Sequence, residues 1–400
     1  MNITSNIISK PPLAGNYGPD FLVIKSGNGS WLEDVKGKRY LDFTGGIAVN
    51  ALGYGREDLA REAYEQMRRV IHTSNLYTTE PVLKLAEAMV KSGDFCAVHF
   101  SNSGSEANET ALKYARLYSL RTKGEGHHKI LAFTNAFHGR TLGALSCTPT
   151  DKYQDPFKPL IPGVVIAPYN DKEALANTLD DSFAAVIVEV IQGEGGLDMM
   201  EQSFADALGE AVKKHDVILI VDEVQTGLSR TGRFYASQWL DLKPDIVTLA
   251  KPLAGGLPLS ATLIPEKINR LIHVGEHGST FGGGPVTTAV AMKVWRRLSD
   301  KHFIGEVEEK GNYFGKLLED LSSKYGFLGS VKGKGLLRGL EYNGKEEVKE
   351  VISSAMKNGL LILRSGKNVL RFAPPLTISK RELERGVDIL EKTIQGGINE

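Results

Sequence analysis

Short apolar runs alternate with helical patterns along the middle of the chain. The runs predict buried strands at Ala97–Ser101, Lys129–Phe133, Val164–Ala167, Ala184–Val190, Val217–Val221, Ile246–Leu249 and Ser260–Ile264. Helical spacing predicts helices from Pro81 to Val90, from Ser105 onward and near Phe204–His215, and a proline such as Pro81 favours a first helical turn. This alternation of strands and helices predicts an α/β fold with a mainly parallel sheet in three layers.

The two ends of the chain have different patterns. Residues 15–50 alternate apolar and polar positions around glycine turns, which predicts a small β meander. The C-terminal part predicts an α+β arrangement with these elements: a helix near Ile304–Lys324, a strand Leu336–Tyr342, a helix Glu346–Asn358, short strands to Phe372 and a helix from Ser379. We therefore divide the chain into an N-terminal segment 1–54, a large domain 55–295 and a C-terminal part 296–400.

Composition sets broad limits on the class of protein. The 400 residues are 42% hydrophobic and 24% charged, as is ordinary for a soluble globular protein. The formal net charge of +0 gives no electrostatic reason to expect nucleic acid or an acidic membrane surface. Two cysteines, Cys96 and Cys147, form neither a disulfide framework nor a CxxC motif, and no metal site is predicted. Without a signal-peptide pattern or a membrane-spanning window, the expected location is cytoplasmic.

An acid and a lysine follow two of the predicted strands. Asp222 ends the apolar run that begins at Val217, and Lys251 comes shortly after Leu249. The carboxyl ends of parallel strands meet at one edge of a sheet, where such folds bind ligands. Pyridoxal phosphate requires both groups, because a carboxylate stabilises its protonated ring nitrogen and an amine binds its aldehyde. The alternative is that Asp222 caps a helix or loop and that Lys251 is an ordinary solvated lysine.

Several polar loops have the composition of binding loops. Residues 102–105 (Asn-Ser-Gly-Ser) lie between a strand and a helix, where backbone N–H groups bind phosphate, although Ser105 alone is equally an N-cap. Phe137 offers an aromatic face and Arg140 a guanidinium for a carboxylate, or they are a packed Phe and a surface Arg. The glycine-rich segments 192–196 and 277–284 are binding loops or simple turns.

Taken in order, these motifs resemble the class III, fold type I aminotransferases that depend on pyridoxal phosphate. The resemblance runs from about Tyr17 to Pro375 through Asp42–Asn50, His72–Tyr77, Asn102–Asn108, Phe133–Leu142, Glu189–Gly196, Asp222–Gly232, Lys251–Pro258 and His277–Pro285. It implies a large domain with a mainly parallel sheet in a three-layer αβα sandwich. The N- and C-terminal segments would join in a smaller α+β domain, and a homodimer would share its active sites.

The resemblance implies a role for each matched cofactor position. Lys251 is similar to the lysine that binds the cofactor's aldehyde and later moves a proton, and Asp222 to the partner of the ring nitrogen. The other positions that match cofactor-binding residues are Ser103, Gly104 and Ser105 for the phosphate, Phe137 for stacking, Val224 for the apolar floor, Gln225 for the ring hydroxyl and Thr280 for the phosphate of the neighbouring subunit's cofactor.

The resemblance also implies a substrate site. Arg140 is similar to the arginine that binds the α-carboxylate of an ornithine-type donor, with Tyr17 and Ser279 nearby. Glu194 and Arg371 resemble a switch pair in which the glutamate masks the arginine while the amine donor is bound and releases it for 2-oxoglutarate. An arginine stays charged and needs an anion whenever it is desolvated, so the pair is physically sound. The alternative is two unrelated surface residues.

The implied reaction moves the terminal amine of N-acetylornithine to 2-oxoglutarate. Succinylornithine, ornithine, 4-aminobutyrate and acylated lysine-pathway amines remain alternative donors, because a few pocket residues decide among them. Val190, Ser260 and Gly284 depart from the usual family pattern in loops that shape the pocket. Rival classes are an aminomutase, a non-catalytic cofactor-binding protein, and nucleotide-dependent enzymes or α/β hydrolases. The chain lacks the GxGxxG and GxxxxGK[ST] motifs of nucleotide-dependent enzymes and the GxSxG motif of α/β hydrolases.

Overall fold

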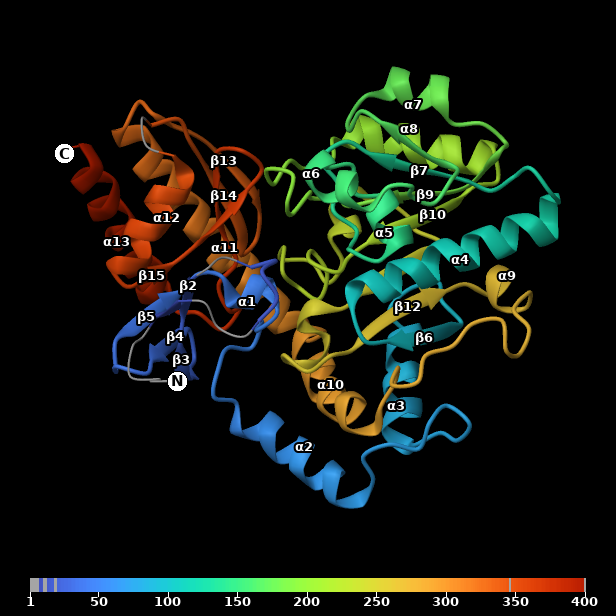
Figure 1. Ribbon diagram of the computed structural model, residues 1–400, viewed down its shortest axis with the longest axis horizontal. Helices are drawn as coiled ribbons and strands as arrows, with labels where there is room; N and C mark the ends of the chain where they lie inside the picture. Colours follow the sequence, from blue (N-terminus) through green and yellow to red (C-terminus); the bar gives the residue numbers. More distant parts are fainter. Residues whose placement is uncertain (1–6, 10–12, 18–19, 345–346, 399–400) are drawn as a thin grey trace.

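The centre of the molecule is a sheet of seven strands. The structure is a computed structural model that describes residues 7–9, 13–17, 20–344 and 347–398. The strands lie side by side in the order β6 (Ala97–Ser101), β12 (Ser260–Ile264), β11 (Ile246–Leu249), β10 (Ile218–Asp222), β9 (Phe183–Val188), β7 (Lys129–Phe133) and β8 (Val164–Ala167). Neighbours from β11 to β8 pair in parallel, whereas β12 is antiparallel to both β11 and β6. The prediction of a mainly parallel sheet is confirmed (Figure 1).

Alternate side chains of the central strands face two different helical layers. On one face, Ile218 and Ile220 pack in the same cluster as Tyr114 of α4 (Gly104–Lys123). On the other face, Leu219 and Val221 pack in a cluster with residues of α8 (Gln202–Lys214). Because consecutive strand residues point to opposite faces, an unbroken apolar run is what a doubly covered sheet requires. The predicted three-layer αβα sandwich is therefore observed.

The C-terminal part forms a smaller antiparallel unit. Its sheet has the order β13 (Leu328–Lys334), β14 (Leu337–Tyr342), β17 (Val369–Phe372) and β16 (Leu363–Ser365). A second sheet joins the two ends of the chain, because β15 (Leu360–Leu361) pairs in parallel with β5 (Arg39–Asp42), followed by β4 (Trp31–Asp34) and β3 (Ile24–Asn28). The helices packed around these sheets are α11 (Lys301–Lys324), α12 (Val348–Lys357) and α13 (Lys380–Ile398). The exact boundaries at residues 54 and 295 stay a prediction.

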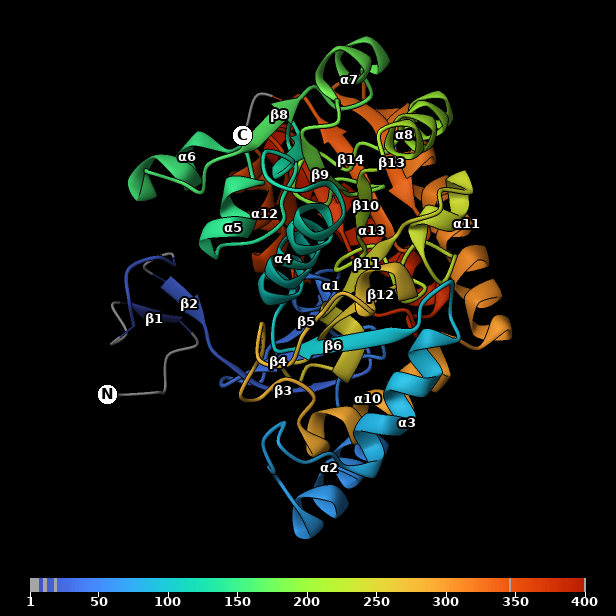
Figure 2. The same ribbon diagram turned by 90° about the vertical axis from the view of Figure 1, so that its right-hand side faces the viewer.

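The remaining elements complete the large domain and the N-terminal segment. They are β1 (Ile7–Ser9), β2 (Asp20–Leu22), α1 (Gly45–Ala48), α2 (Glu57–Arg69), α3 (Glu80–Val90), α5 (Leu142–Ser146), α6 (Asp151–Gln154), α7 (Lys172–Thr178), α9 (Glu266–Asn269) and α10 (Pro285–Leu298), with short 3-10 turns at Asp155–Phe157, Ala236–Leu240 and Lys251–Ala254. Figure 2 shows that β1 and β2 form a ribbon beside the main body. The sequence pattern did not predict α2, α10 or β13. Among the described residues, no helix has the length and apolar character needed to cross a membrane.

Candidate active site

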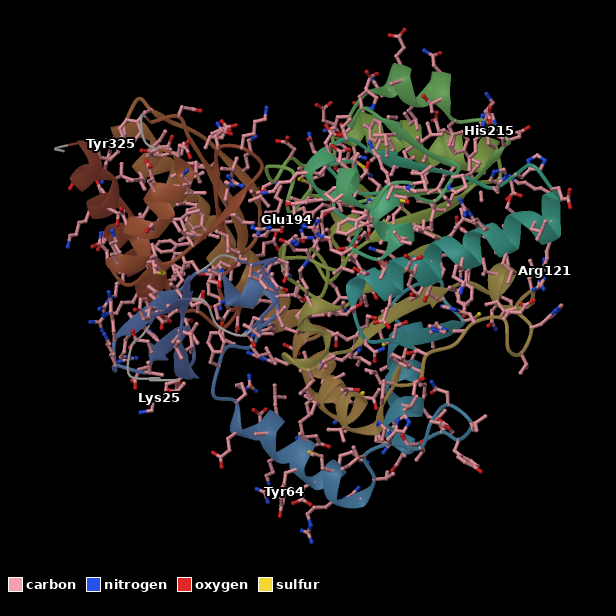
Figure 3. The ribbon with its side chains drawn as sticks, viewed as in Figure 1. Lys25, Tyr64, Arg121, Glu194, His215 and Tyr325 are labelled. Carbon is pink, nitrogen blue, oxygen red and sulfur yellow. The ribbon has the colours of Figure 1, made fainter. Side chains whose placement is uncertain are left out.

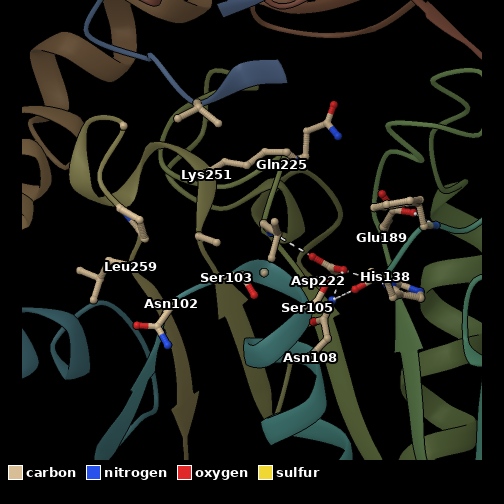
Figure 4. A pocket seen from close by; sticks show the side chains of 18 of the residues that line it. Asn102, Ser103, Ser105, Asn108, His138, Glu189, Asp222, Gln225, Lys251 and Leu259 are labelled. Carbon is tan, nitrogen blue, oxygen red and sulfur yellow. Dashed lines mark hydrogen bonds and ion pairs between the residues drawn. The ribbon is translucent and has the colours of Figure 1, made fainter. Parts of the chain in front are cut away.

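A cavity of about 330 Å³ opens beyond the carboxyl ends of β10 and β11, at the edge of the sheet where the sequence predicts it. Its lining combines residues from the start of α4, from the loop after β7, and from the segments that follow β10 and β11. The predicted site residues that line it are Ser103, Gly104, Ser105, Phe137, Asp222, Val224, Gln225 and Lys251. Figure 4 shows these segments converging on one space.

Asp222 is the last residue of β10 and is fixed by three donors. Its Oδ2 accepts hydrogen bonds from Nδ2 of Asn108 and Nδ1 of His138, each at 2.8 Å, and its Oδ1 accepts one from the backbone N–H of Val224 at 3.0 Å. Asn108 is held in turn, because its Oδ1 accepts a hydrogen bond from the Thr248 hydroxyl at 2.8 Å. Several donors on one buried carboxylate stabilise its negative charge and its orientation. The sequence did not single out Asn108 or His138 for this role.

Lys251 follows β11 and opens a 3-10 turn that runs to Ala254. Burial lowers the pKa of its ammonium group below the ordinary value, against the opposing effect of the Asp222 and Glu194 carboxylates. A lower pKa increases the fraction of neutral amine, which is the form that attacks an aldehyde. The sheet therefore presents an anchored acid and a lysine with a lowered pKa to the same cavity.

The N-terminus of α4 forms another wall of the cavity. Ser103 is the N-cap, since its Oγ accepts a hydrogen bond from the backbone N–H of Glu106 at 3.3 Å. Ser105 lies inside the helix and its Oγ accepts a hydrogen bond from the backbone N–H of Arg140 at 3.1 Å, so the alternative that Ser105 is the N-cap is wrong. The first N–H groups of a helix lack acceptors within the helix and carry its positive end, which suits a phosphate.

The chemical types of the groups in the cavity match those that bind pyridoxal phosphate. The cavity offers a carboxylate at Asp222, an amine at Lys251, an amide at Gln225 and helix N–H groups at residues 103–105. Gly104 allows the start of α4 to pack closely against Val224, because a Cβ on residue 104 would lie only 2.7 Å from Cγ1 of Val224. Among the described residues, no group of three or more His, Cys, Asp or Glu side chains is arranged to hold a metal ion.

Glu189 is a further buried acid at the cavity wall that the sequence analysis quoted without a role. Its carboxylate accepts hydrogen bonds from the backbone N–H groups of Phe137 at 3.0 Å and Gly193 at 3.2 Å. Burial raises the pKa of Glu189 to about 7, with His138 opposing the rise and Asp222 adding to it. Glu189 directly follows the buried run of β9, which is the same signal that identified Asp222 after β10.

Glu194 and Arg371 meet, although they are 177 residues apart. Nη1 of Arg371 lies 2.5 Å from Oε1 of Glu194, and it also donates a hydrogen bond to the carbonyl of Gly193 at 2.7 Å. The Arg371 side chain is 3% exposed and that of Glu194 31% exposed, so the arginine is desolvated and the glutamate reaches solvent. Figure 3 places Glu194 between the large domain and the C-terminal strands. The alternative that Glu194 and Arg371 are two unrelated surface residues is therefore wrong, because they form an ion pair and Arg371 is buried.

Six predicted substrate or cofactor residues lie outside the cavity lining: the paired Glu194 and Arg371, and also Arg140, Tyr17, Thr280 and Ser279. Arg140 is exposed, with its guanidinium 3.4 Å from the ring centroid of Tyr153, and no carboxylate among the described residues pairs with it. Tyr17 is 69% exposed in the segment before β2. Thr280 lines a separate small depression, and Ser279 approaches the site only through its Oγ, 3.3 Å from Nδ2 of Asn102. Within one chain, the structure does not bring Tyr17 and Thr280 to the cavity.

The three departures from the family pattern also lie outside the cavity lining. Val190 and Ser260 are fully buried, the first after β9 and the second at the start of β12. Gly284 is the residue before α10. None of the three removes a polar group that faces the cavity.

Comparisons with known proteins find similarity to aminotransferases over nearly the whole chain. The family profile described as "Aminotransferase class-III" matches residues 13–394. The chain is 42% identical over 377 residues to the probable mitochondrial acetylornithine aminotransferase of Dictyostelium discoideum, covering 92% of this chain and 83% of that protein. It is 40% identical over 378 residues to the acetylornithine aminotransferase of Methanocaldococcus jannaschii, covering 94% of each.

Solved structures of similar proteins share the fold. The ornithine aminotransferase from Toxoplasma gondii ME49 has a TM-score of 0.92 at 31% identity, covering 97% of this chain and 93% of that chain. The N-acetylornithine aminotransferase from Stenotrophomonas maltophilia K279a has a TM-score of 0.82 at 32% identity, covering 94% of this chain and 96% of that chain. Both matches therefore include the large domain and the C-terminal part of the chain.

Proposed function

The chain belongs to the class-III aminotransferases, and from that premise we propose that it transfers the terminal amine of N-acetylornithine to 2-oxoglutarate. The products would be N-acetylglutamate semialdehyde and glutamate, a step of arginine biosynthesis. The enzyme depends on pyridoxal phosphate, as its family does. The observation that carries the substrate proposal is the ion pair between Glu194 and Arg371, because it lets one site accept partners of different charge.

The cofactor, when bound, withdraws electrons from the substrate carbon that carries the amine and stores that amine between the two half-reactions. Asp222 would keep a proton on the ring nitrogen, where its three hydrogen bonds hold its charge in place. Lys251, with its lowered pKa, would bind the aldehyde and then move a proton at the substrate carbon. These are the two residues that we assign to the chemistry.

The remaining cofactor residues would bind and orient. Ser103, Gly104 and Ser105 would hold the phosphate at the positive end of α4. Phe137 and Val224 would hold the ring through apolar contacts, and Gln225 would bond to the ring hydroxyl. All of them line the same cavity as Lys251, which supports this assignment.

The Glu194–Arg371 pair would sort the two substrates by charge. While the pair is closed, the arginine is neutralised, and the site favours a donor whose reacting end has no carboxylate. When Glu194 turns away, Arg371 needs another anion, and a carboxylate of 2-oxoglutarate supplies it. Arg140, with Tyr17 and Ser279, would bind the α-carboxylate of the donor. Arg140 has no acidic partner among the described residues that would compete with it.

We further propose a homodimer in which Thr280 reaches the phosphate of the partner's cofactor. Thr280 cannot serve the cavity of its own chain, since it lines a separate depression. Large apolar side chains are exposed around it, with Leu76 at 86%, Tyr77 at 74% and Phe281 at 66%. Such clustered exposure is typical of a covered interface. Sedimentation of the purified protein, together with loss of cofactor affinity in Thr280→Ala, tests this arrangement.

A cytoplasmic location also remains our proposal. Two of the eukaryotic relatives are named as mitochondrial, whereas the archaeal relative carries no such name. Cell fractionation followed by detection of the intact chain tests it, and recovery in an organelle fraction would contradict it.

A panel of single half-reactions tests the donor. Holoenzyme is mixed with each amine in the absence of 2-oxoglutarate, and the absorbance change of the cofactor gives a rate for each. We expect N-acetylornithine to be fastest, with ornithine as the second candidate because ornithine aminotransferases share the fold. A clear preference for 4-aminobutyrate would overturn the proposed donor. Turnover without any keto acid would instead indicate an aminomutase.

A further inference from the structure

A second cavity lies against the first and is bordered by positive side chains. It has a volume of about 560 Å³ and lies between the loops of the large domain at residues 135–137, 150–153 and 194–198 and the turn between β16 and β17. Phe137 lines both cavities, so the second adjoins the cofactor cavity at that ring. We call it the vestibule, with Lys152, Glu194, Lys332, Arg364 and Lys367 as its charged lining together with Asp198.

The positive charges of the vestibule are only partly neutralised. Lys332 is paired with Asp198 and with Glu341, each at 2.9 Å. Glu194 is paired with Arg371 on the inner side. This leaves Lys152, Arg364 and Lys367, which are exposed and pair with no carboxylate among the residues that the structure describes. The charge of Arg364 helps to lower the pKa of the Glu347 carboxyl, but that carboxylate is hydrogen-bonded to Lys349 and not to Arg364.

The turn that carries two of these cations is fastened to the loop that carries Glu194. The backbone N–H of Gly366 donates a hydrogen bond to the carbonyl of Glu194 at 2.8 Å. The buried Ser365 hydroxyl accepts one from the N–H of Gly196 and donates one to the carbonyl of Gly193, each at 2.8 Å. Arg364 and Lys367 flank these anchored residues in sequence. Their backbone positions at the vestibule are therefore fixed, although their side chains are solvated.

Fixed positive charge next to the cofactor cavity discriminates between the two substrates of the proposed reaction. 2-Oxoglutarate carries two negative charges, whereas N-acetylornithine carries one carboxylate and one ammonium group and is neutral overall. The vestibule lining has four basic and two acidic side chains and therefore an excess of positive charge. A cleft lined by one sign of charge raises the local concentration of opposite ions and their association rate by roughly 10- to 1,000-fold, and a net excess acts in the same direction. We propose that Lys152, Arg364 and Lys367 form an outer recognition site that draws small dicarboxylates toward Arg371. The inference rests on the proposed function only in taking a dicarboxylate as the acceptor.

Reversing the three charges tests this site. The variant Lys152→Glu/Arg364→Glu/Lys367→Glu is compared with wild type in each half-reaction separately. We expect kcat/KM for 2-oxoglutarate to fall about tenfold at low ionic strength, and kcat/KM for the amine donor to change less than about twofold. At about 0.5 M salt the difference should largely disappear, because the Debye length is then only a few ångströms.

A matched variant separates local charge from net charge. Lys172→Glu/Lys214→Glu/Lys316→Glu makes the same change in net charge on exposed residues of α7, α8 and α11, none of which lines the vestibule. We expect it to keep both half-reactions within about twofold of wild type. The neutral variant Lys152→Gln/Arg364→Gln/Lys367→Gln should give an intermediate loss with 2-oxoglutarate. Equal losses in the local and distant variants, or equal losses with both substrates, would overturn the proposal.

Binding of glutarate provides a readout that does not depend on turnover. Glutarate has both carboxylates of the acceptor but no keto group, so its affinity for holoenzyme can be measured by calorimetry. We expect the charge-reversed variant to bind it about tenfold more weakly at low salt. Unchanged glutarate affinity would contradict the vestibule site. If the amine panel selects a donor other than N-acetylornithine, the glutarate comparison still decides the vestibule, so the two failures are distinguishable.

Discussion

The cofactor cavity and the vestibule use charged side chains in opposite ways. In the cavity, Asp222 is buried and held by three donors, and beside the cavity the buried Arg371 is paired with Glu194. In the vestibule, Lys152, Arg364 and Lys367 are exposed, and none has an acidic partner among the described residues. A buried charge acts at contact distance and depends on geometry, whereas an exposed charge acts through a field that salt screens. The two regions should therefore respond differently to the same kind of mutation.

The largest effect is expected at the lysine of the cavity. Lys251→Ala removes both the amine that binds the aldehyde and the group that moves the proton, so we expect turnover to fall by roughly 10⁴-fold. Steady-state assays with many equivalents of substrate check this. Lys243→Ala, which removes an exposed lysine paired with Asp241, should stay near the wild-type rate. Sustained turnover by Lys251→Ala would refute the mechanism.

The next largest effect is expected at the acid of the cavity. Asp222→Ala should weaken cofactor binding and lower the rate by roughly 100- to 1,000-fold, because a neutral pyridine is a poor electron sink. It also leaves the Nδ donors of Asn108 and His138 without their acceptor, at about 1–3 kcal/mol of stability. Equilibrium dialysis of the cofactor and rate measurements check both effects.

A second substitution at the same position separates charge from shape. Asp222→Asn keeps the size of the side chain and one oxygen acceptor but removes the negative charge. We expect it to lose rate nearly as Asp222→Ala does. A near-normal rate in either variant would count against the role of Asp222.

A smaller effect is expected at the arginine between the two regions. Arg371→Lys keeps the charge but loses the planar fork that binds a carboxylate, so we expect kcat/KM for 2-oxoglutarate to fall roughly 10- to 100-fold. The amine half-reaction should change much less, which distinguishes this variant from those at Lys251. Arg381→Lys, on the exposed side of α13, is the matched control. Equal losses in both half-reactions would place Arg371 outside acceptor recognition.

The smallest expected effect concerns stability rather than rate. Burial raises the pKa of Glu189 from 4.5 to about 7, so the folded protein binds this proton more tightly than the unfolded chain. Stability is then greatest below the unfolded pKa and is lost as pH rises through about 7, by no more than about 3 kcal/mol. Denaturant unfolding of holoenzyme between about pH 5 and about pH 8 measures the slope. Glu189→Gln should flatten it, and an identical slope in both proteins would contradict the assignment.

Much of the fold could be predicted because buried strands leave a local signal. The apolar runs gave the strands of the central sheet within a few residues, and their ends brought Asp222 and Lys251 to one cavity. The same signal failed for β13, in which Gly329 and Gly333 interrupt the apolar pattern. It also failed for α2, most of whose residues are exposed or only partly buried.

The contacts that fix the site could not be predicted in the same way. Asn108 and His138 bind Asp222 across 114 and 84 residues. The packing of α4 against the sheet brings Asn108 there, and the loop after β7 brings His138. The pairing of Glu194 with Arg371 was expected from the resemblance alone, because neither strand pattern nor spacing indicates it. Tyr17 and Thr280 remain predictions, since the role given to Thr280 requires a second copy of the chain.

The reversed direction of β12 limits how the enzyme can be redesigned. Between β11 and β12 the chain turns back within residues 250–259, and Lys251 lies in that short return. Parallel strands such as β9 and β10 are joined through a helix, which can absorb an inserted residue in its surface loops. The part of the return that directly follows Lys251 has little room for an inserted residue, because Pro252, Leu253 and Ala254 are buried. Changes of chain length are therefore tolerated better in the surface loops around α8 than beside Lys251, where an insertion would displace the lysine itself.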